Sequence, residues 1–581
     1  AGRSEFEKGK FRQQLERQGE MSEMKGQSRK DEHQREEYEE EGSKQKMNPR
    51  KCVNLDGWMM GKADAYPNSE SSSTTTTTTY SRNAIVSCYN RHSHGADISI
   101  IEGCMGLHDA RDGISDSGST AQIAKYLSAP VILTIDGKSM ARSVAAMILG
   151  YKMFDPGVNL GGVVVNKVGG SVHGQWIRDA VAGDERLDGV LFAGCVPLDE
   201  CAIVKERYLG LTMPHEHGNA DSNENGSEND HEISALAESN VKSSEVEDRY
   251  VRLAALMEHH LALDDIIRLA KSSISALPAK IAATDTAIPM DQSTRINASS
   301  SALRCRIAVA QDVAFCFYYQ DNLSMLHNKG AELIPFSPLH SNRLPENIDG
   351  IYMGGGYPEL HAKRLEENES LRADIKSFSD AGGVIYAECG GFMYLTNQIL
   401  VRNDQHEQKG DGGEGDGEMR DVYTARNMCG VFPITIRMTP HVKMYYAEAV
   451  FTSSNPIFPT GGRARGQRYH YSEVMEDDNI KGENANVNIS LPLSVTPQLP
   501  GAKPQGEGYI VKNTMASYFH LYFASFVNAN PAAGGGATHT DPVPDTLTLA
   551  DHFVESAIAH SPYRKAYVVS FASTATEIIY A

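Results

Sequence analysis

The sequence predicts an α/β protein with two domains, each built on a parallel sheet. Its 581 residues are 40% hydrophobic, which is enough for more than one buried core. Short runs that are apolar throughout alternate with longer amphipathic runs, as in parallel strands covered by helices on both faces. This pattern stops at a polar stretch, residues 282–301, and then starts again. The restart predicts the second domain.

The first domain is expected to contain four strands. Each candidate is a continuous apolar run, as expected of a strand buried on both faces. The candidates are ADISIIEG (96–103), APVILTID (129–136), LGGVVVNKV (160–168) and GVLFAGCVP (189–197). Helical stretches such as SGSTAQIAKYL (117–127) lie between them, and this order of strands and helices favours a parallel sheet.

The second domain begins with RCRIAVAQDVAFCFYY (304–319). Further strands are predicted within GIYMGGGYP (350–358) and GGVIYAECG (382–390). The whole chain then divides into five parts. They are a charged, disordered segment over 1–50, a first domain over 51–275, a linker over 276–302, a second domain over 303–528 and an extension over 529–581.

Low-complexity stretches interrupt the patterned sequence without replacing it. They are rich in Ser, Thr, Asn, Asp, Glu and Gly, which predicts disordered surface insertions. These stretches are residues 69–80, 216–232, 403–419 and 530–542.

Composition excludes several classes of protein. The formal net charge is −20, from 55 basic and 75 acidic residues, which argues against a nucleic-acid partner. No run of about 18 apolar residues appears, so no membrane partner is expected. The nine cysteines are scattered, and no pair has CxxC spacing, so neither a zinc site nor a disulfide framework is indicated. Most of them are expected to be buried, reduced thiols.

Cys389 lies between a predicted buried strand, GVIYAE, and a stretch that can begin a helix, FMYLTNQI. The two glycines after it permit the tight, strained turn of a nucleophile elbow. We expect the start of that helix to lower the pKa of the thiol. The alternative is a structural cysteine before a glycine turn, and the spacing alone does not decide between them.

Two other stretches favour a nucleophile. YMGGGYPEL (352–360) follows a predicted strand, and its backbone amides are suited to an oxyanion. His520 lies in the apolar run MASYFHLYFAS (515–525), where it fits the role of base for a distant cysteine. An ordinary loop and a core histidine are the structural alternatives.

Several stretches resemble the cobyrinic acid a,c-diamide synthase family. GGGYPEL, AECGGFMYL, GQRYHYSEV (466–474) and SYFHLYFAS are similar to its glutamine amidotransferase domain. NLDGWMM (54–60), IIEGCMGLHDA (100–110), GSTAQIAKYLSAPVILTIDGKSMARSVAAMILG (118–150) and KERYLGL (205–211) look like its synthetase half. The resemblance covers roughly residues 52–211 and 304–527. It implies a P-loop-NTPase-like (dethiobiotin-synthetase-like) domain followed by a flavodoxin-like amidotransferase domain.

The resemblance implies roles for residues of the second domain. Cys389 attacks the side-chain amide of glutamine and releases ammonia, and His520 takes the thiol proton. Backbone amides near Gly355, Gly356 and Gly390 stabilise the oxyanion. The sequence departs from the family at Tyr522, where the family has a second histidine, and it contains no HPE triplet, so no triad carboxylate is assigned.

The resemblance also implies that the first domain uses ATP and Mg²⁺ to activate a corrin-ring carboxylate, which ammonia then converts to an amide. Glu102 is the candidate magnesium ligand, because Mg²⁺ prefers hard oxygen ligands. Asp109 resembles a residue near the acyl substrate, and Asn166 resembles an adenine contact. Asp56 and Asp136 are weaker candidates, for which strand-end capping is the preferred interpretation.

The family's N-terminal phosphate loop has no match in residues 1–51. A fragment with a replaced start and a protein that has lost ATP binding are both compatible with this. The last residues, KAYVVSFASTATEIIYA (565–581), resemble the opening strand and helix of cobalamin-type periplasmic substrate-binding proteins. We therefore expect a fusion that is truncated at both ends, with a simple terminal strand and helix as the alternative.

The leading functional hypothesis is ATP-dependent, glutamine-hydrolysing amidation of the a and c carboxylates of cobyrinic or hydrogenobyrinic acid. The alternatives are a related synthase acting on another acid, and a ligase-dead glutaminase or non-catalytic corrinoid-binding protein. The expected partners are glutamine and a corrinoid acid, with homo-oligomerisation left open. We expect a cytoplasmic location, with an organellar one as the alternative.

Overall fold

The computed structural model describes most of the residues that the sequence predicts to be folded. The described residues are 55, 59–60, 74–103, 105–110, 113–203, 206–207, 210–211, 250–274, 303–402, 422–452, 457–475, 491–497, 501–528 and 548–562. The predicted disordered segment 1–50, the linker, the terminal stretch 565–581 and the insertions at 216–232, 403–419 and 530–542 lie outside them. None of the described helices is both long and apolar enough to cross a membrane.

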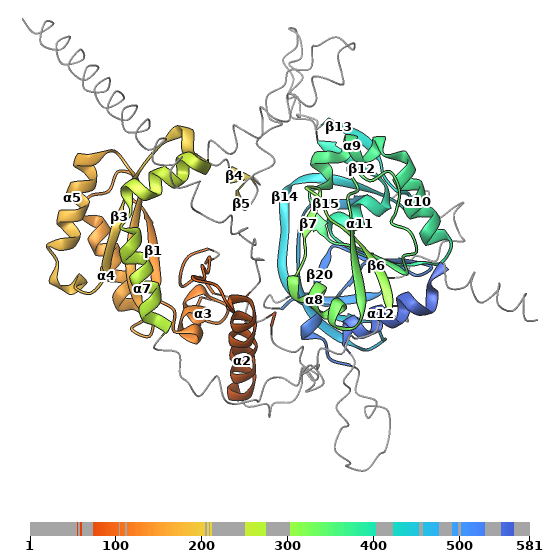
Figure 1. The fold of residues 1–581 in the computed structure, drawn as a ribbon, viewed down its shortest axis with the longest axis horizontal. Helices are drawn as coiled ribbons and strands as arrows, with labels where there is room; N and C mark the ends of the chain where they lie inside the picture. The colour runs from red at the N-terminus through yellow and green to blue at the C-terminus, as the bar shows by residue number, and fades with distance from the viewer. Residues whose placement is uncertain are drawn as a thin grey trace, which may run out of the picture. The chain divides into compact units, whose positions relative to one another are not determined.

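The first domain contains a parallel three-stranded sheet in the order β1-β2-β3 (Figure 1). The strands are β1 (Val131–Asp136), β2 (Leu160–Val168) and β3 (Leu191–Pro197). All three were predicted from their apolar runs, and the parallel pairing confirms the predicted sheet type. Asp136 pairs in register with Asn166, so both polar side chains stand at the carboxyl ends of neighbouring strands.

Helices pack around this sheet. They are α3 (Thr120–Leu127), α4 (Ser143–Phe154), α5 (Ser171–Ala182) and α7 (Leu263–Ile274). Helix α2 (Thr74–Ser93) packs against α3 instead, in a cluster that includes Ile85 and Ile123. The Ser119 side chain caps α3 by accepting from the amide of Gln122, which fixes the start of the predicted helix. Short hairpin strands β4 (Glu206–Arg207) and β5 (Gly210–Leu211) follow β3.

Two expectations for this domain are corrected. Residues 96–103 form no strand, and the side chain of Ile100 is 89% exposed. A strand needs a neighbour to satisfy its backbone groups, and no described strand pairs with this segment. Residues 74–80 of the threonine-rich tract 69–80 are also helical, because α2 begins at Thr74.

The second domain is built on a six-stranded sheet in the order β18-β19-β11-β9-β6-β8. Five strands are parallel, and only β18 runs antiparallel to its neighbour. The strands are β6 (Cys305–Ala310), β8 (Ala331–Phe336), β9 (Gly350–Met353), β11 (Val384–Glu388), β18 (Tyr509–Val511) and β19 (Thr514–Ser517). The α/β class with parallel-sheet domains is therefore confirmed.

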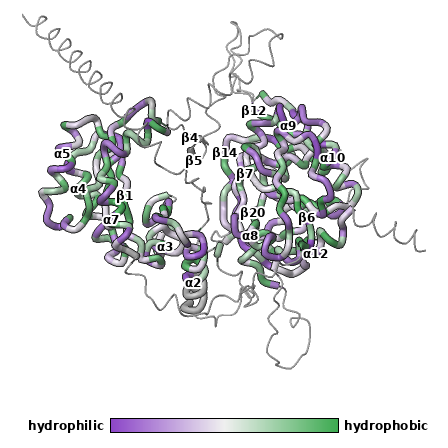
Figure 2. Tube along the Cα trace, viewed as in Figure 1, coloured by the Kyte–Doolittle hydropathy of each residue, from purple (hydrophilic) through white to green (hydrophobic). Residues whose placement is uncertain are grey.

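Strand β11 shows how the sheet is buried on both faces. Ile385 and Ala387 belong to one core cluster, whereas Val384 and Tyr386 belong to another. Successive side chains of a strand point to opposite faces, so a strand between two cores is apolar throughout. The hydrophobic colour along the central strands of this domain reflects the same pattern (Figure 2). Glu388 follows on the Tyr386 face.

Helices and short elements complete the parallel layer. The helices are α8 (Gln320–Asn328), α9 (Ala362–Glu367), α10 (Glu369–Asp380), α11 (Gly390–Leu395) and α12 (Leu549–His560). A two-stranded ladder joins β7 (Phe315–Phe317) to β10 (Gly355–Gly356).

A second, mostly antiparallel sheet was not predicted. Its main path is β13-β12-β14-β15-β20, and β16 and β17 pair beside β14. The strands are β12 (Thr396–Arg402), β13 (Tyr423–Asn427), β14 (Phe432–Phe451), β15 (Arg463–Met475), β16 (Leu493–Pro497), β17 (Gln505–Glu507) and β20 (Phe519–Leu521). Long strands with one half-exposed face carry polar residues, so they lack the apolar run that was used to find strands.

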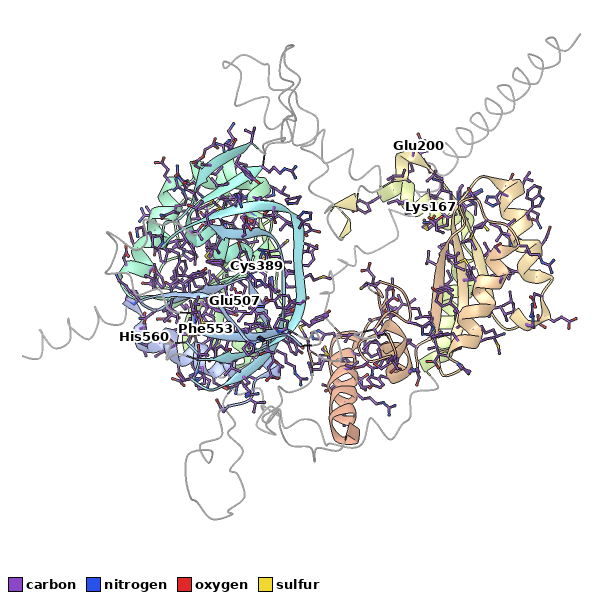
Figure 3. The ribbon with its side chains drawn as sticks, turned by 180° about the vertical axis from the view of Figure 1, so that it is seen from behind. Lys167, Glu200, Cys389, Glu507, Phe553 and His560 are labelled. Carbon is purple, nitrogen blue, oxygen red and sulfur yellow. The ribbon has the colours of Figure 1, made fainter. Side chains whose placement is uncertain are left out.

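The second domain extends beyond the predicted limit at residue 528. Helix α12 begins with a capping box between Thr548 and Asp551. Phe553 and Val554 are fully buried in the core cluster that also holds Tyr352 and Tyr386. Phe553 lies inside the domain in Figure 3. Residues 549–560 are therefore part of the folded domain rather than of a linker.

Replacing Phe553 by Ala is expected to destabilise the second domain by about 3–5 kcal/mol, because it removes a buried aromatic ring and leaves a cavity. Chemical denaturation of the full chain measures this. Glu555→Ala is the control on the same helix; its side chain is 60% exposed and pairs with Arg304, so a loss of about 0–1 kcal/mol is expected. Equal losses in the two variants would contradict the placement of α12 in the core.

Candidate functional site

The candidate site lies at the carboxyl edge of the second domain's parallel sheet. Strands β9, β11 and β19 are parallel neighbours, so their carboxyl ends meet at one edge. Gly355 follows β9, Cys389 follows β11, and His520 comes three residues after β19 ends. Three stretches that are far apart in the sequence are thus brought together by the sheet topology.

Cys389 occupies a strained turn between β11 and α11. Its backbone angles are φ 48° and ψ −102°, an unfavourable region for a residue with a side chain. Its amide donates to the carbonyl of Ser517 at 2.7 Å, which ties the turn to β19. This is the geometry predicted for a nucleophile elbow.

The two glycines after Cys389 are required by close backbone contacts. A Cβ on Gly390 would lie 2.9 Å from the Gly356 amide nitrogen, and one on Gly391 would lie 2.5 Å from the Met353 carbonyl oxygen. The Gly391 amide donates to the carbonyl of Gly354 at 2.9 Å. The elbow therefore packs directly on the glycine-rich loop after β9, with no room for side chains between them.

The Cys389 thiol is protonated at rest. Burial, followed by the nearby charges of Glu359 and Glu388, raises its pKa to about 12, although the Gly390 amide and Arg468 act in the opposite direction. Its Sγ donates to the Tyr469 carbonyl at 3.4 Å. The expected lowering of the thiol pKa by the helix is wrong, because desolvation outweighs a helix of six residues. A base must therefore remove the proton.

His520 is suited to be that base. Its ring packs against Gly355, where a Cβ would lie 2.5 Å from Cε1, and meets the Phe317 ring edge-on at 4.8 Å between centroids. Burial lowers its pKa to about 4, so the imidazole is neutral near pH 7 and can accept a proton. Its Nδ1 has no hydrogen-bond partner among the described residues.

Glu388 is a site residue that the sequence analysis missed. Its carboxyl is buried and accepts from the Tyr386 hydroxyl at 2.6 Å, the Leu521 amide at 3.0 Å and the Tyr352 hydroxyl at 3.1 Å. Burial raises its pKa to about 7, while these three donors act to lower it. The available signal was an acid at the end of a strand that is otherwise apolar, immediately before the cysteine.

The three glycines predicted to form an oxyanion site lie around these residues. Gly355 contacts the His520 ring, and Gly356 contacts Gly390. The Gly390 amide faces the Cys389 sulfur closely enough to affect its pKa. The structure thus gathers all five residues predicted for the second domain, while their catalytic roles stay predictions.

The stretch 466–474, on β15, forms one side of the site. Arg468 donates to His470 at 2.8 Å and pairs with Glu507 at 3.3 Å. His470 stacks on Tyr518 with ring centroids 3.7 Å apart. Burial, and then the charge of Arg468, lower the pKa of His470 to about 2, so it stays neutral. This network fixes the strand that carries the Tyr469 carbonyl. Cys389 and Glu507 lie within the same domain in Figure 3.

Tyr522, which the sequence analysis matched to a second histidine of the family, contacts Asp321. Its hydroxyl donates to Asp321 at 2.6 Å, and His92 lies 3.1 Å from the other oxygen of that carboxylate. Cys88 and His92 also lie close enough to Asp321 to resemble a metal site. However, Tyr522, His92 and Arg91 already occupy both carboxylate oxygens, so hydrogen bonding explains the cluster.

The residues predicted for the first domain lie at strand ends and loops. Asn166 is half-buried at the end of β2, next to exposed Asp136, which pairs with Lys167 at 3.0 Å. Asp109 accepts from the Gly106 amide at 2.8 Å, and Glu102 is exposed beside Gly103, which packs against Thr120. Asp56 lies outside the described residues. Their roles also stay predictions.

Comparison with known proteins identifies the family. Residues 306–527 match the model of the CobB/CobQ-like glutamine amidotransferase domain. The chain is 34% identical over 481 residues to the cobyrinate a,c-diamide synthase of Methanosarcina acetivorans, covering 82% of each protein. It is 34% identical to the enzyme of the same name from Syntrophotalea carbinolica, covering 82% of this chain and 84% of that protein. The identity to the Listeria innocua protein of that name is 33%, covering 76% of this chain and 81% of that one. The chain therefore belongs to the cobyrinate a,c-diamide synthase family.

Proposed function

We propose that the chain hydrolyses glutamine at Cys389 and uses the ammonia to amidate the a and c carboxylates of cobyrinic or hydrogenobyrinic acid with ATP. The observation that carries the first half is the convergence of Cys389, His520 and three glycines at one sheet edge. Membership of the family supports the second half, since its relatives are named cobyrinate a,c-diamide synthases. The proposal places both activities in one chain.

The proposed glutamine hydrolysis starts from a neutral Cys389 thiol and a neutral His520 imidazole. The thiol is neutral at rest and His520 is an unprotonated base, so the proton moves from Sγ to the imidazole as sulfur bonds to the amide carbon. The oxyanion is stabilised by backbone amides near Gly355, Gly356 and Gly390. His520 then gives the proton to the leaving ammonia, and a glutamyl thioester remains on Cys389.

Water completes the reaction. His520 removes a proton from water as its oxygen bonds to the thioester carbon, and the carbon–sulfur bond breaks. The thiolate recovers the proton from the imidazolium, and glutamate leaves. One glutamine and one water give one glutamate and one ammonia, and the site returns to its starting state.

The first domain provides hard oxygen ligands of the kind that Mg²⁺ prefers. We assign the exposed Glu102 carboxylate, beside Gly103, as the residue that would hold Mg²⁺. We assign Asn166 to the nucleotide and Asp109 to the acyl substrate. ATP held with Mg²⁺ would supply the phosphoryl group that converts a carboxylate to an acyl phosphate and leaves ADP, and ammonia would then displace inorganic phosphate to give the amide.

Replacing Cys389 by Ser is expected to reduce kcat for glutamine hydrolysis by roughly 10³-fold or more, because a buried hydroxyl is a much poorer nucleophile. Glutamate release from the full chain measures this. Cys429→Ser makes the same replacement at another buried cysteine of this domain and should keep the parent rate. Parent activity in Cys389→Ser would rule out this residue as the nucleophile.

Replacing Glu102 by Gln is expected to lower amide formation about 100-fold or more while glutamine hydrolysis continues, because a magnesium ligand is lost from the first domain only. Mass spectrometry of the corrinoid, with ATP, Mg²⁺ and cobyrinic acid present, measures the product. Glu185→Gln changes an exposed glutamate of the same domain and should have no effect. Unchanged product formation in Glu102→Gln would remove Glu102 from the magnesium site.

A further inference from the structure

We propose that Glu388 is the positioning residue of the glutaminase site, holding His520 through its Nδ1 hydrogen. The proposal rests on the proposed glutamine hydrolysis at Cys389. The sequence has no carboxylate in the expected place after the histidine. In this proposal Glu388, the residue directly before the nucleophile, provides that carboxylate. The nucleophile and the positioning group would then be adjacent residues of one strand end.

The first argument is the unsatisfied nitrogen of His520. Nδ1 is buried and has no hydrogen-bond partner among the described residues. The Glu388 Oε2 atom lies 3.8 Å from it. This is slightly beyond hydrogen-bond distance, and catalytic hydrogen bonds are often long before substrate binds. A buried polar group without a partner is costly, so a small movement that closes this gap is favourable.

The second argument is the set of donors around the Glu388 carboxyl. Oε1 accepts from the Tyr386 hydroxyl and from the Leu521 amide. Within the described residues, Oε2 accepts only from the Tyr352 hydroxyl. A carboxylate oxygen can accept two hydrogen bonds, so Oε2 has one position left, on the atom that lies near His520. The Leu521 amide can only donate, and the two tyrosine hydroxyls can donate as well, which suits an ionised carboxyl.

The third argument is the backbone connection between the two residues. Leu521 follows His520, and its amide is bonded to Glu388 at 3.0 Å. The same carboxyl therefore fixes the backbone beside the histidine and faces its ring. Phe317 and Gly355 pack against the His520 ring from other directions. A contact with the Glu388 carboxyl would then fix the orientation of the ring.

This contact has a specific chemical consequence. A hydrogen on Nδ1 directed at Glu388 leaves Nε2 unprotonated, which is the tautomer that can take the thiol proton. When that proton arrives on Nε2, the carboxylate stabilises the imidazolium. Glu388 itself neither gains nor loses the proton, and it does not touch the substrate.

The carboxyl must be ionised to serve this role. The hydroxyls of Tyr352 and Tyr386 and the His520 imidazole face it, and the Tyr318 hydroxyl and the Cys389 thiol are close enough to interact with its charge. Burial raises the Glu388 pKa to about 7. The ionised fraction, and with it the activity, is therefore expected to fall as pH falls through about 7, although His520 stays neutral down to about pH 4.

Glu388→Gln in the full chain tests the proposal. A glutamine amide would donate to Nδ1 and favour the wrong tautomer, so kcat for glutamine hydrolysis should fall by roughly 10²- to 10⁴-fold. The KM for glutamine should stay within about twofold, because Glu388 does not touch substrate. Asp349→Asn is the matched control; Asp349 is also buried, but it accepts from the Arg306 amide at the start of β9, and parent kcat is expected.

Two readouts separate positioning from a structural role. The pKa of Glu388 is higher in the folded state than in the unfolded state, so its ionisation lowers the free energy of unfolding as pH rises through about 7. Glu388→Gln should therefore be at least as stable as the parent at pH 8. The parent profile of kcat/KM should fall on the acid side with an apparent pKa near 7, and this fall should be absent in Glu388→Gln.

Nitrogen NMR of isotope-labelled histidine decides the contact without relying on activity. The His520 signals are identified from their loss in His520→Gln. The parent should show a proton on Nδ1, and Glu388→Gln should move it to Nε2. The proposal is overturned by a parent with the proton on Nε2, or by parent kcat in Glu388→Gln. A parent that hydrolyses no glutamine would instead remove the proposed function, while the spectrum would still decide the Glu388 contact.

Discussion

The site depends on one constraint, the direct backbone contact between the turn after β11 and the loop after β9. Gly390 packs on Gly356, and Gly391 packs on Met353, at separations where any Cβ would clash. This contact brings the nucleophile elbow against the loop that supplies candidate oxyanion amides. It also holds Cys389 in a conformation that a free chain would avoid. The surrounding sheet, buried on both faces, maintains that strain.

The parallel layer could be predicted because burial on both faces leaves a continuous apolar run. The strands β1, β2, β3, β9 and β11 were all found in this way, and their ends located Cys389 and Gly355. The predicted strand at 96–103 does not form, although its sequence is also largely apolar. An apolar run shows only that a segment could form a strand, and no described strand pairs with this one. The long strands β14 and β15 carry polar residues on a half-exposed face, so that signal was absent.

The candidate site was predicted in part. Cys389, His520 and the three glycines were identified by their surroundings in the sequence, and the fold brings them together. The ionisation of the thiol could not be predicted, because it depends on burial and on the charges of Glu359 and Glu388. The sequence does not single out Glu388, because this carboxylate precedes the cysteine instead of following the histidine. Only the meeting of β11 and β20 shows that the residue before the cysteine faces the imidazole.

The protonated state of the Cys389 thiol also bears on how the protein tolerates oxidants. Peroxides and alkylating agents react with thiolates, and this sulfur is buried, protonated and bonded to the Tyr469 carbonyl. The exposed Cys316 is accessible to such reagents, whereas the Cys389 sulfur is buried. Under the proposed mechanism, this buried sulfur would become reactive only when His520 removes its proton, so the strained turn would also provide chemical selectivity.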